Sequence, residues 1–109
     1  MTIIRNHITI IGKLGAYTNL THFENGKSIA RFGLSTLRTE RNNQGKYIKK
    51  MQWHNLFAWG PLADYIQLHA EKGKSVAVQG RLIKRTFTNR SGVEKQTTEI
   101  EVQHIVGLN

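Results

Sequence analysis

Three aromatic side chains stand among polar and cationic neighbours, where they are suited to stacking on flat ligands. Trp53 and Trp59 have the same parity in one alternating segment, so a regular strand places both indoles on one face, about 20 Å apart. Phe87 is bracketed by cations in the run Lys84-Arg85-Thr86-Phe87-Thr88-Asn89-Arg90. Aromatic rings along a cationic surface hold single nucleic-acid strands by base stacking. The alternative is that these rings fill the core, and it is strongest for the neighbouring Phe57.

The charge of the chain favours an anionic polymer as ligand. Its 109 residues include 16 Lys and Arg but 7 Asp and Glu, which gives a net charge of +9 and a pI near 10.3. A solubilising surface is the alternative explanation, and an anionic membrane is disfavoured because the one expected helix carries Asp64 and Glu71 against Lys72. The candidate phosphate contacts are Lys13, Arg31, Arg38, Arg41, Lys49, Lys50, Lys72, Lys74, Arg81, Lys84 and Arg85.

The sequence offers no pattern typical of an enzyme, and we expect no catalytic residue, metal or cofactor. Glu99 and Glu101 lie two apart on one strand face, where solvent exposure is the simplest expectation. The five histidines lack metal-ligand spacing, and the absence of cysteine excludes thiolate sites. The Gly12-Lys13-Leu14-Gly15 segment lacks the rest of a phosphate-loop motif, so we interpret it as a turn or bulge.

Period-two alternation and turn residues predict five strands and one helix. The helix starts at Pro61 and is capped by Gly73, and Arg38 to Lys50 is expected to form a long loop or flexible hairpin tip. The expected strands cover residues 7–14, 28–37, 52–59, 76–87 and 97–104. Five strands with one helix between the third and fourth predict an all-β OB-fold, a five-stranded Greek-key barrel.

The whole chain, residues 1–109, is expected to form a single domain. We found neither a linker nor an internal repeat, and the only proline is Pro61. No apolar run approaches the ~18–20 residues that cross a bilayer, and Met1–Arg5 do not begin a leader sequence. These features predict a soluble, cytoplasmic protein.

The sequence resembles the bacterial single-stranded DNA-binding protein family from Asn6 to about Ile105. The resemblance rests on Ile10 to Gly15, Asn25 to Phe32, Trp53-His54, Trp59 to Ala63, Lys72 to Val76, Val78 to Leu82 and Thr97 to Ile100. It implies an OB-fold, commonly in a homotetramer, that binds single-stranded DNA at the nucleoid during replication, recombination and repair. It also implies that Trp53, Trp59 and Phe87 stack on bases and that His54 lies near subunit contacts.

The chain departs from the family pattern at two places. Glu40 stands where relatives often carry another stacking aromatic, and the chain stops at Asn109 without the acidic C-terminal tail that relatives have. A tailless primosome-type accessory protein, which bridges DNA and a replication enzyme, is therefore an alternative function. An OB-fold that binds oligosaccharide or protein is a further alternative, although such a module has no need of the +9 charge.

Overall fold

The computed structural model describes residues 6–108, apart from the side chain of Tyr17. The expectation about a leader sequence falls on Met1–Arg5, which lie outside the described residues. The elements are β1 (Ile8–His22), β2 (Ser28–Arg41), β3 (Tyr47–Trp59), α1 (Gly60–His69), β4 (Ser75–Thr88) and β5 (Glu94–Gly107). The predicted order, with one helix between the third and fourth strands, is confirmed.

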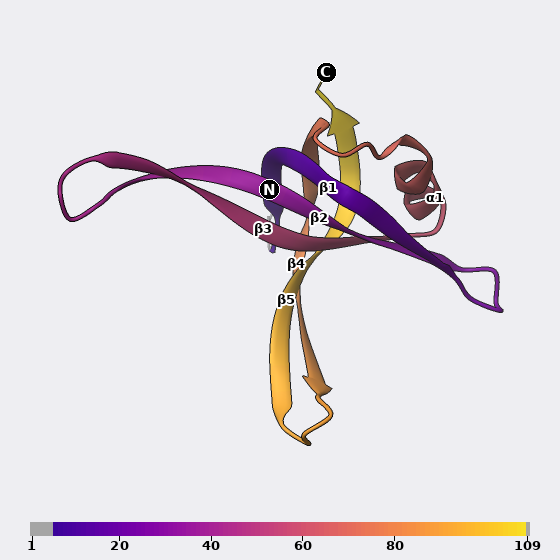
Figure 1. The fold of residues 1–109 in the computed structure, drawn as a ribbon. Helices are drawn as coiled ribbons and strands as arrows, with labels where there is room; N and C mark the ends of the chain where they lie inside the picture. Colours follow the sequence, from indigo (N-terminus) through magenta and orange to yellow (C-terminus); the bar gives the residue numbers. More distant parts are fainter. Residues whose placement is uncertain (1–5, 109) are drawn as a thin grey trace, which may run out of the picture.

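The five strands close into a barrel in the order β1-β2-β3-β5-β4 (Figure 1). Neighbouring strands are antiparallel except for β3 and β5, which run parallel where Leu56 pairs with Ile100. The side chains of Leu34, Leu56 and Val78 are almost fully buried inside the barrel, and Ile66 packs against them from α1. The prediction of a five-stranded OB-fold is therefore confirmed.

Helix α1 is shorter than the sequence suggested. Pro61 lies in its first turn as predicted, but the helix ends at His69, where the backbone N–H of Ala70 donates to the carbonyl of Ile66 at 2.8 Å. The prediction that Gly73 caps the helix is wrong. Gly73 lies in the following turn, where its N–H donates to the carbonyl of Leu14 at 2.9 Å and ties this turn to β1.

Of the two alternatives for residues 38–50, the long loop is wrong and the hairpin is correct, because β2 and β3 continue as a paired ribbon to Arg41 and Tyr47. A tight turn at residues 42–46 closes the hairpin, with the Asn42 side chain accepting from the N–H groups of Gln44 and Lys46. Gly45 adopts a positive φ of 76° in this turn. The ribbon hides few side chains, so the alternation of buried residues that marks a core strand is missing from its sequence.

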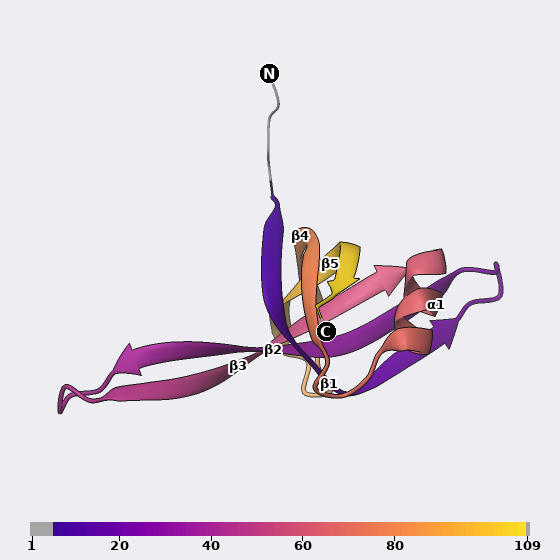
Figure 2. The same ribbon diagram turned by 90° about the horizontal axis from the view of Figure 1, so that it is seen from above.

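Hairpins project from the barrel in different directions (Figures 1 and 2). We call residues 36–52 the β2–β3 arm and residues 83–98 the β4–β5 arm. The first strand also exceeds its predicted length, since β1 runs on to His22 and pairs with β2 up to Ser28. The barrel thus carries solvent-exposed ribbons well beyond its core.

The Gly12 to Gly15 segment lies at a bend of β1. Gly12, Lys13 and Leu14 pair regularly with the neighbouring strands, and the register of β1 against β2 shifts only between Leu14 and Thr18, so of this segment the predicted bulge includes Gly15 alone. A Cβ atom at Gly12 would collide with the carbonyl oxygen of Ser35 on the neighbouring strand. Glycine at this position therefore permits the close approach of β1 to β2.

Candidate nucleic-acid interface

Trp53 of β3 and Phe87 of the β4–β5 arm line one open groove of about 640 Å³, here called the Trp53 groove. Trp53 is 58% exposed and Phe87 is 50% exposed. Both rings thus offer a face to a ligand, and the core alternative is wrong for them. The other lining residues are Gly15, Ala16, Asn19, Arg31, Phe32, Gly33, Asn55, Leu56, Thr97 and Glu99.

Two glycines form the surface on which the Trp53 indole packs. A Cβ atom at Gly15 would lie 3.2 Å from Cζ3 of Trp53, and one at Gly33 would lie 3.4 Å from its Cε3. The indole therefore rests closely on the backbone of β1 and β2. This contact fixes the ring while leaving its outer face exposed.

Trp59 lines a second groove, of about 520 Å³, here called the Trp59 groove. Its ring centre lies 6.3 Å from that of Phe23, and the two planes are inclined by 35°. Phe57 meets Trp59 edge-on and is itself buried, as the core alternative predicted for that ring. The remaining lining residues are Thr21, Ile29, Arg31, Arg81, Ile83, Arg85 and Glu101.

Sequence reasoning missed Phe23. It directly precedes the Glu24-Asn25-Gly26 turn, where its N–H and carbonyl both bond to the turn backbone. Phe23 is 45% exposed although it packs beside Trp59. An exposed aromatic next to a turn was the available signal, but only the fold brings it to the Trp59 groove.

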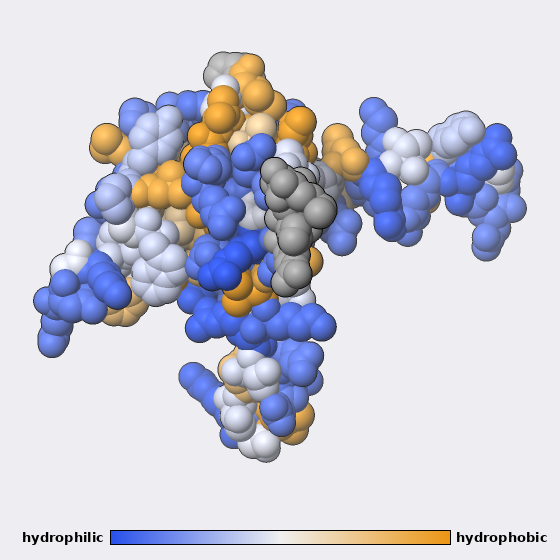
Figure 3. All heavy atoms as spheres, turned by 180° about the vertical axis from the view of Figure 1, so that it is seen from behind, coloured by the Kyte–Doolittle hydropathy of each residue, from blue (hydrophilic) through white to orange (hydrophobic). Residues whose placement is uncertain are grey.

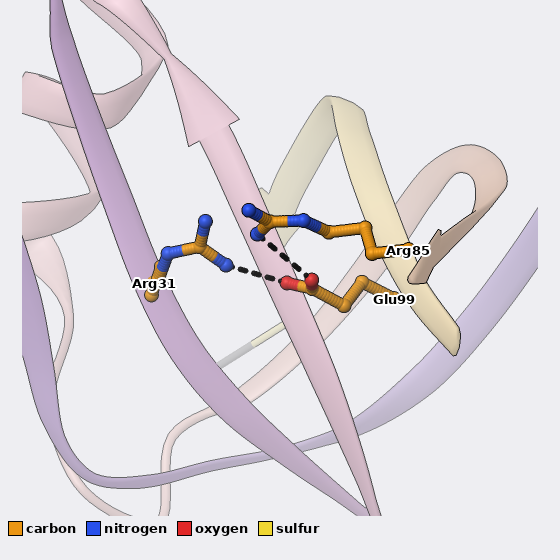
Figure 4. A network of polar contacts seen from close by, with 3 residues as sticks. All are labelled: Arg31, Arg85 and Glu99. Carbon is orange, nitrogen blue, oxygen red and sulfur yellow. Dashed lines mark hydrogen bonds and ion pairs between the residues drawn. The ribbon is translucent and has the colours of Figure 1, made fainter. Parts of the chain in front are cut away.

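The expectation that Glu99 is solvent-exposed is wrong: Glu99 is 6% exposed and lies between two arginines (Figure 4). Its Oε2 accepts from Nη1 of Arg31 at 2.6 Å, and its Oε1 accepts from Nη1 of Arg85 at 3.1 Å. Arg81 pairs in the same way with the half-buried Glu101 at 2.7 Å. Three of the predicted phosphate contacts thus reach the grooves while paired with carboxylates.

The four predicted cations of the β2–β3 arm divide between its two faces. In the register of β2 and β3, Arg41 and Lys49 share the parity of Trp53 and so lie on its face of the ribbon. Arg38 and Lys50 lie on the opposite face, where both form ion pairs with Glu40. Glu40 is therefore neutralised by its neighbours and faces away from the row that contains Trp53.

Near the end of the same arm, Arg41 stacks on Tyr47. The guanidinium carbon lies 5.0 Å from the centre of the tyrosine ring, and the two residues are partners in the β2–β3 register. Tyr47 is 69% exposed and has the parity of Trp53. The sequence analysis missed this ring because it interpreted the segment as a loop or flexible hairpin tip and so assigned its side chains to no strand face.

The other predicted cations lie in separate places. Lys13 pairs in register with Ser35, which in turn pairs with Trp53. Lys13 therefore lies on the same face of the sheet as Trp53. Lys84 has the opposite parity to Phe87 on β4. Neither Lys72 nor Lys74 is among the described residues that line the two grooves, and Lys74 instead lines a small cavity beside α1.

His54 lies on the face of β3 opposite to Trp53. It is half-buried, and its Nε2 lies 2.9 Å from the hydroxyl of Thr36 on β2. The side chain thus has a fixed partner within its own subunit. Its assignment to a subunit interface stays a prediction.

Within residues 6–108, no three His, Asp or Glu side chains gather into a group that could hold a metal ion. No described helix is long and apolar enough to cross a membrane.

The fold and these grooves define an OB-fold barrel that presents aromatic rings and arginines on its outer surface. The family model described as the single-strand binding protein family matches residues 5–108. The chain belongs to this family.

Several known proteins are similar to the chain. Single-stranded DNA-binding protein 1 of Chlorobaculum tepidum is 33% identical over 96 residues, which are 87% of this chain and 59% of that protein. The single-stranded DNA-binding protein of Neisseria meningitidis is 26% identical over 107 residues, 95% of this chain and 62% of that protein. The chain thus spans about three fifths of the length of these relatives.

Solved structures are similar over almost the whole chain. The Plasmodium falciparum protein of this family, solved in complex with single-stranded DNA, matches with a TM-score of 0.88 and 27% identity, covering 100% of this chain and 99% of that one. A deletion mutant of the single-stranded DNA binding protein from Thermus aquaticus matches with a TM-score of 0.81 and 23% identity, covering 96% of this chain and 51% of that one. The second likeness concerns the fold alone.

Proposed function

We propose that this chain binds single-stranded DNA with little sequence preference and without catalysis, and so protects single strands during replication, recombination and repair. The observation that carries this proposal is the exposure of Trp53, Phe87 and Trp59 in two grooves that arginines also line. Membership of the single-strand binding protein family supports it, as does the likeness to a relative solved with single-stranded DNA.

Binding by this surface combines stacking with charge. Each nucleobase has an aromatic face, so rings such as Trp53 and Phe87 accept any base, with each stack contributing roughly 1–3 kcal/mol. Cations beside the rings attract the phosphates and displace counterions, which makes affinity depend on salt. Arg41 and Lys49, which share the face of Trp53, would extend this path along the β2–β3 arm.

The exposed Tyr47 would add a stacking surface near the end of that arm. Its ring is supported on one side by Arg41, which leaves the other side for a base. Binding to chromosomal single strands would also place the protein in the cytoplasm, at the nucleoid.

A competition assay tests the proposed function. The fluorescence anisotropy of a labelled dT oligomer should rise on addition of the protein and fall again with unlabelled dT. Unlabelled duplex of equal length should compete far less, because its bases are already stacked on one another. Equal competition by duplex and single strand would contradict the proposal.

We also propose that the chain works as a homo-oligomer, most simply a tetramer. The support is an apolar strip on the outer face of the barrel, where Ile11 pairs in register with Ala77 and Ala77 with Val106. Ile11 and Val106 are both well exposed, and Figure 3 shows hydrophobic side chains gathered on the barrel near the C-terminal end. Covering such a strip with a second copy would complete the burial that a small barrel leaves unfinished.

A further inference from the structure

One cluster of three residues lies where the two grooves meet. Arg31 lines both grooves, whereas Glu99 lines only the Trp53 groove and Arg85 only the Trp59 groove. In Figure 4 the two arginine side chains approach Glu99 from different strands, β2 and β4. A strand that stacks in both grooves must therefore pass this cluster.

The cluster is built around a buried charge. A carboxylate as buried as Glu99 is costly unless it is paired, and here each of its oxygens accepts from a different arginine. The arginine side chains are only partly covered, at 40% exposure for Arg31 and 49% for Arg85. Each uses one Nη1 donor on Glu99, and a guanidinium has five N–H donors in a rigid plane. Donors of both arginines thus remain for a second acceptor.

A second feature restricts Arg31. Its guanidinium carbon lies 5.7 Å from the ring centre of the buried Phe57, so the group is held by a ring as well as by a carboxylate. The two contacts limit the directions in which its other donors can point. With a formal charge of two cations and one anion, the cluster keeps one net positive charge.

We propose that Glu99 is a positioning residue that holds Arg31 and Arg85 as a phosphate-binding subsite between the Trp53 and Trp59 grooves. The inference rests on the proposed binding of single-stranded DNA. A phosphate placed between the guanidiniums would accept charge-assisted hydrogen bonds from both, while Glu99 keeps them in place. The acidic residue would thus strengthen binding of a polyanion.

Simple electrostatics makes the opposite prediction for Glu99. Removing a negative charge beside a DNA path should strengthen binding, because one source of repulsion for phosphate is lost. Glu101 provides a matched control, since among residues 6–108 its one ion pair is with Arg81, and it lines the Trp59 groove. Replacing Glu101 with a neutral residue should show the effect of removing a negative charge while Arg31 and Arg85 keep their positions around Glu99.

The test compares Glu99→Gln and Glu101→Gln with the unaltered chain, using dT oligomers of about 4 and about 15 nucleotides, within the range of sites on one OB-fold. Glu99→Gln should weaken binding of the longer oligomer by about tenfold, equivalent to one charge-assisted contact. Its effect on the shorter oligomer, which can occupy one groove, should be smaller. Glu101→Gln should leave affinity unchanged or raise it slightly.

Each outcome decides the inference. Unchanged or tighter binding of the longer oligomer by a folded Glu99→Gln chain would overturn it, whereas failure of the unaltered chain to bind dT would instead overturn the proposed function. If Glu99→Gln does not fold, Arg85→Lys replaces it, because lysine keeps the charge but loses the rigid plane of donors. Arg85→Lys should then lose affinity for the longer oligomer, and wild-type affinity in that variant would overturn the inference.

Discussion

Trp53 of β3 and Phe87 of the β4–β5 arm lie far apart in the sequence yet line the same groove. The parallel contact of β3 with β5 closes the barrel, and Phe87 and Thr97 of the β4–β5 arm line the groove together with Trp53 and Asn55 of β3. Barrel closure therefore does more than bury Leu56 and Ile100. It also brings two exposed rings together on a common surface.

The first prediction separates stacking rings from core rings. Trp53→Ala and Phe87→Ala should each weaken dT binding by roughly 1–3 kcal/mol while leaving the melting temperature nearly unchanged, because both rings are exposed. Phe57→Ala should instead lower the free energy of unfolding by about 3–5 kcal/mol, since this ring is buried. Anisotropy titrations and thermal melts of the same variants would separate the loss of binding from the loss of stability. Loss of cooperative melting in Trp53→Ala would assign that indole to the core.

The second prediction concerns the glycines of β1. Gly12→Ala should destabilise the fold, because the added methyl group meets the backbone oxygen of Ser35, which cannot move alone. Gly15→Ala should instead shift the exposed indole of Trp53 and weaken dT binding with a smaller effect on melting. The tryptophan emission spectrum should report the changed position of the indole directly. If Gly15→Ala alters neither the spectrum nor the affinity, the position of the indole does not depend on its contact with Gly15.

A third prediction contrasts Tyr47 with Glu40. Tyr47→Ala should weaken binding of a long dT oligomer by up to roughly 1–3 kcal/mol, whereas Tyr47→Phe keeps the ring and serves as the control.

Glu40→Trp should give little gain in affinity, because position 40 faces away from the strand face that carries Trp53. Glu40→Gln should strengthen binding slightly at low salt and less at high salt, since it frees Arg38 and Lys50. A large gain from Glu40→Trp would place the DNA on the other face of the arm.

The fourth prediction tests the oligomer. Ile11→Asp should place a carboxylate in the exposed apolar strip and shift the assembly towards smaller species, while the fold of each barrel persists because Ile11 is outside the core. His54→Lys should also weaken assembly if that residue lies near a symmetry axis. Light scattering at micromolar concentration gives the masses. A wild-type monomer would contradict the proposed assembly.

The sequence was sufficient to predict the barrel because its core strands obey a clear rule. Leu56 and Ala58 belong to the core cluster while Asn55 and Phe57 between and beside them line the outer grooves, and Gly60-Pro61 marks the change from strand to helix. The prediction that Trp53 and Trp59 share one strand face followed from parity alone, and the register agrees. The core residues and strand faces could thus be predicted, because they follow from alternation within a continuous strand.

The arms and the ion pairs could not be predicted in the same way. Residues 38–50 have no buried side to create a periodic pattern, so a paired ribbon and a polar loop have similar sequences. Glu99 was expected to be exposed because its burial depends on Arg31 and Arg85, which approach from two other strands. Such contacts arise from the closed topology, and local sequence does not contain them.

Base stacking on the two grooves is tested most directly by a titration of the protein with a dT oligomer at two salt concentrations, followed by tryptophan emission. We expect strong quenching, because Trp53 and Trp59 are the chain's two tryptophans and both rings are exposed. Affinity should fall steeply at the higher salt concentration. Saturable binding that leaves the emission unchanged, or no binding at low salt, would contradict stacking on these grooves.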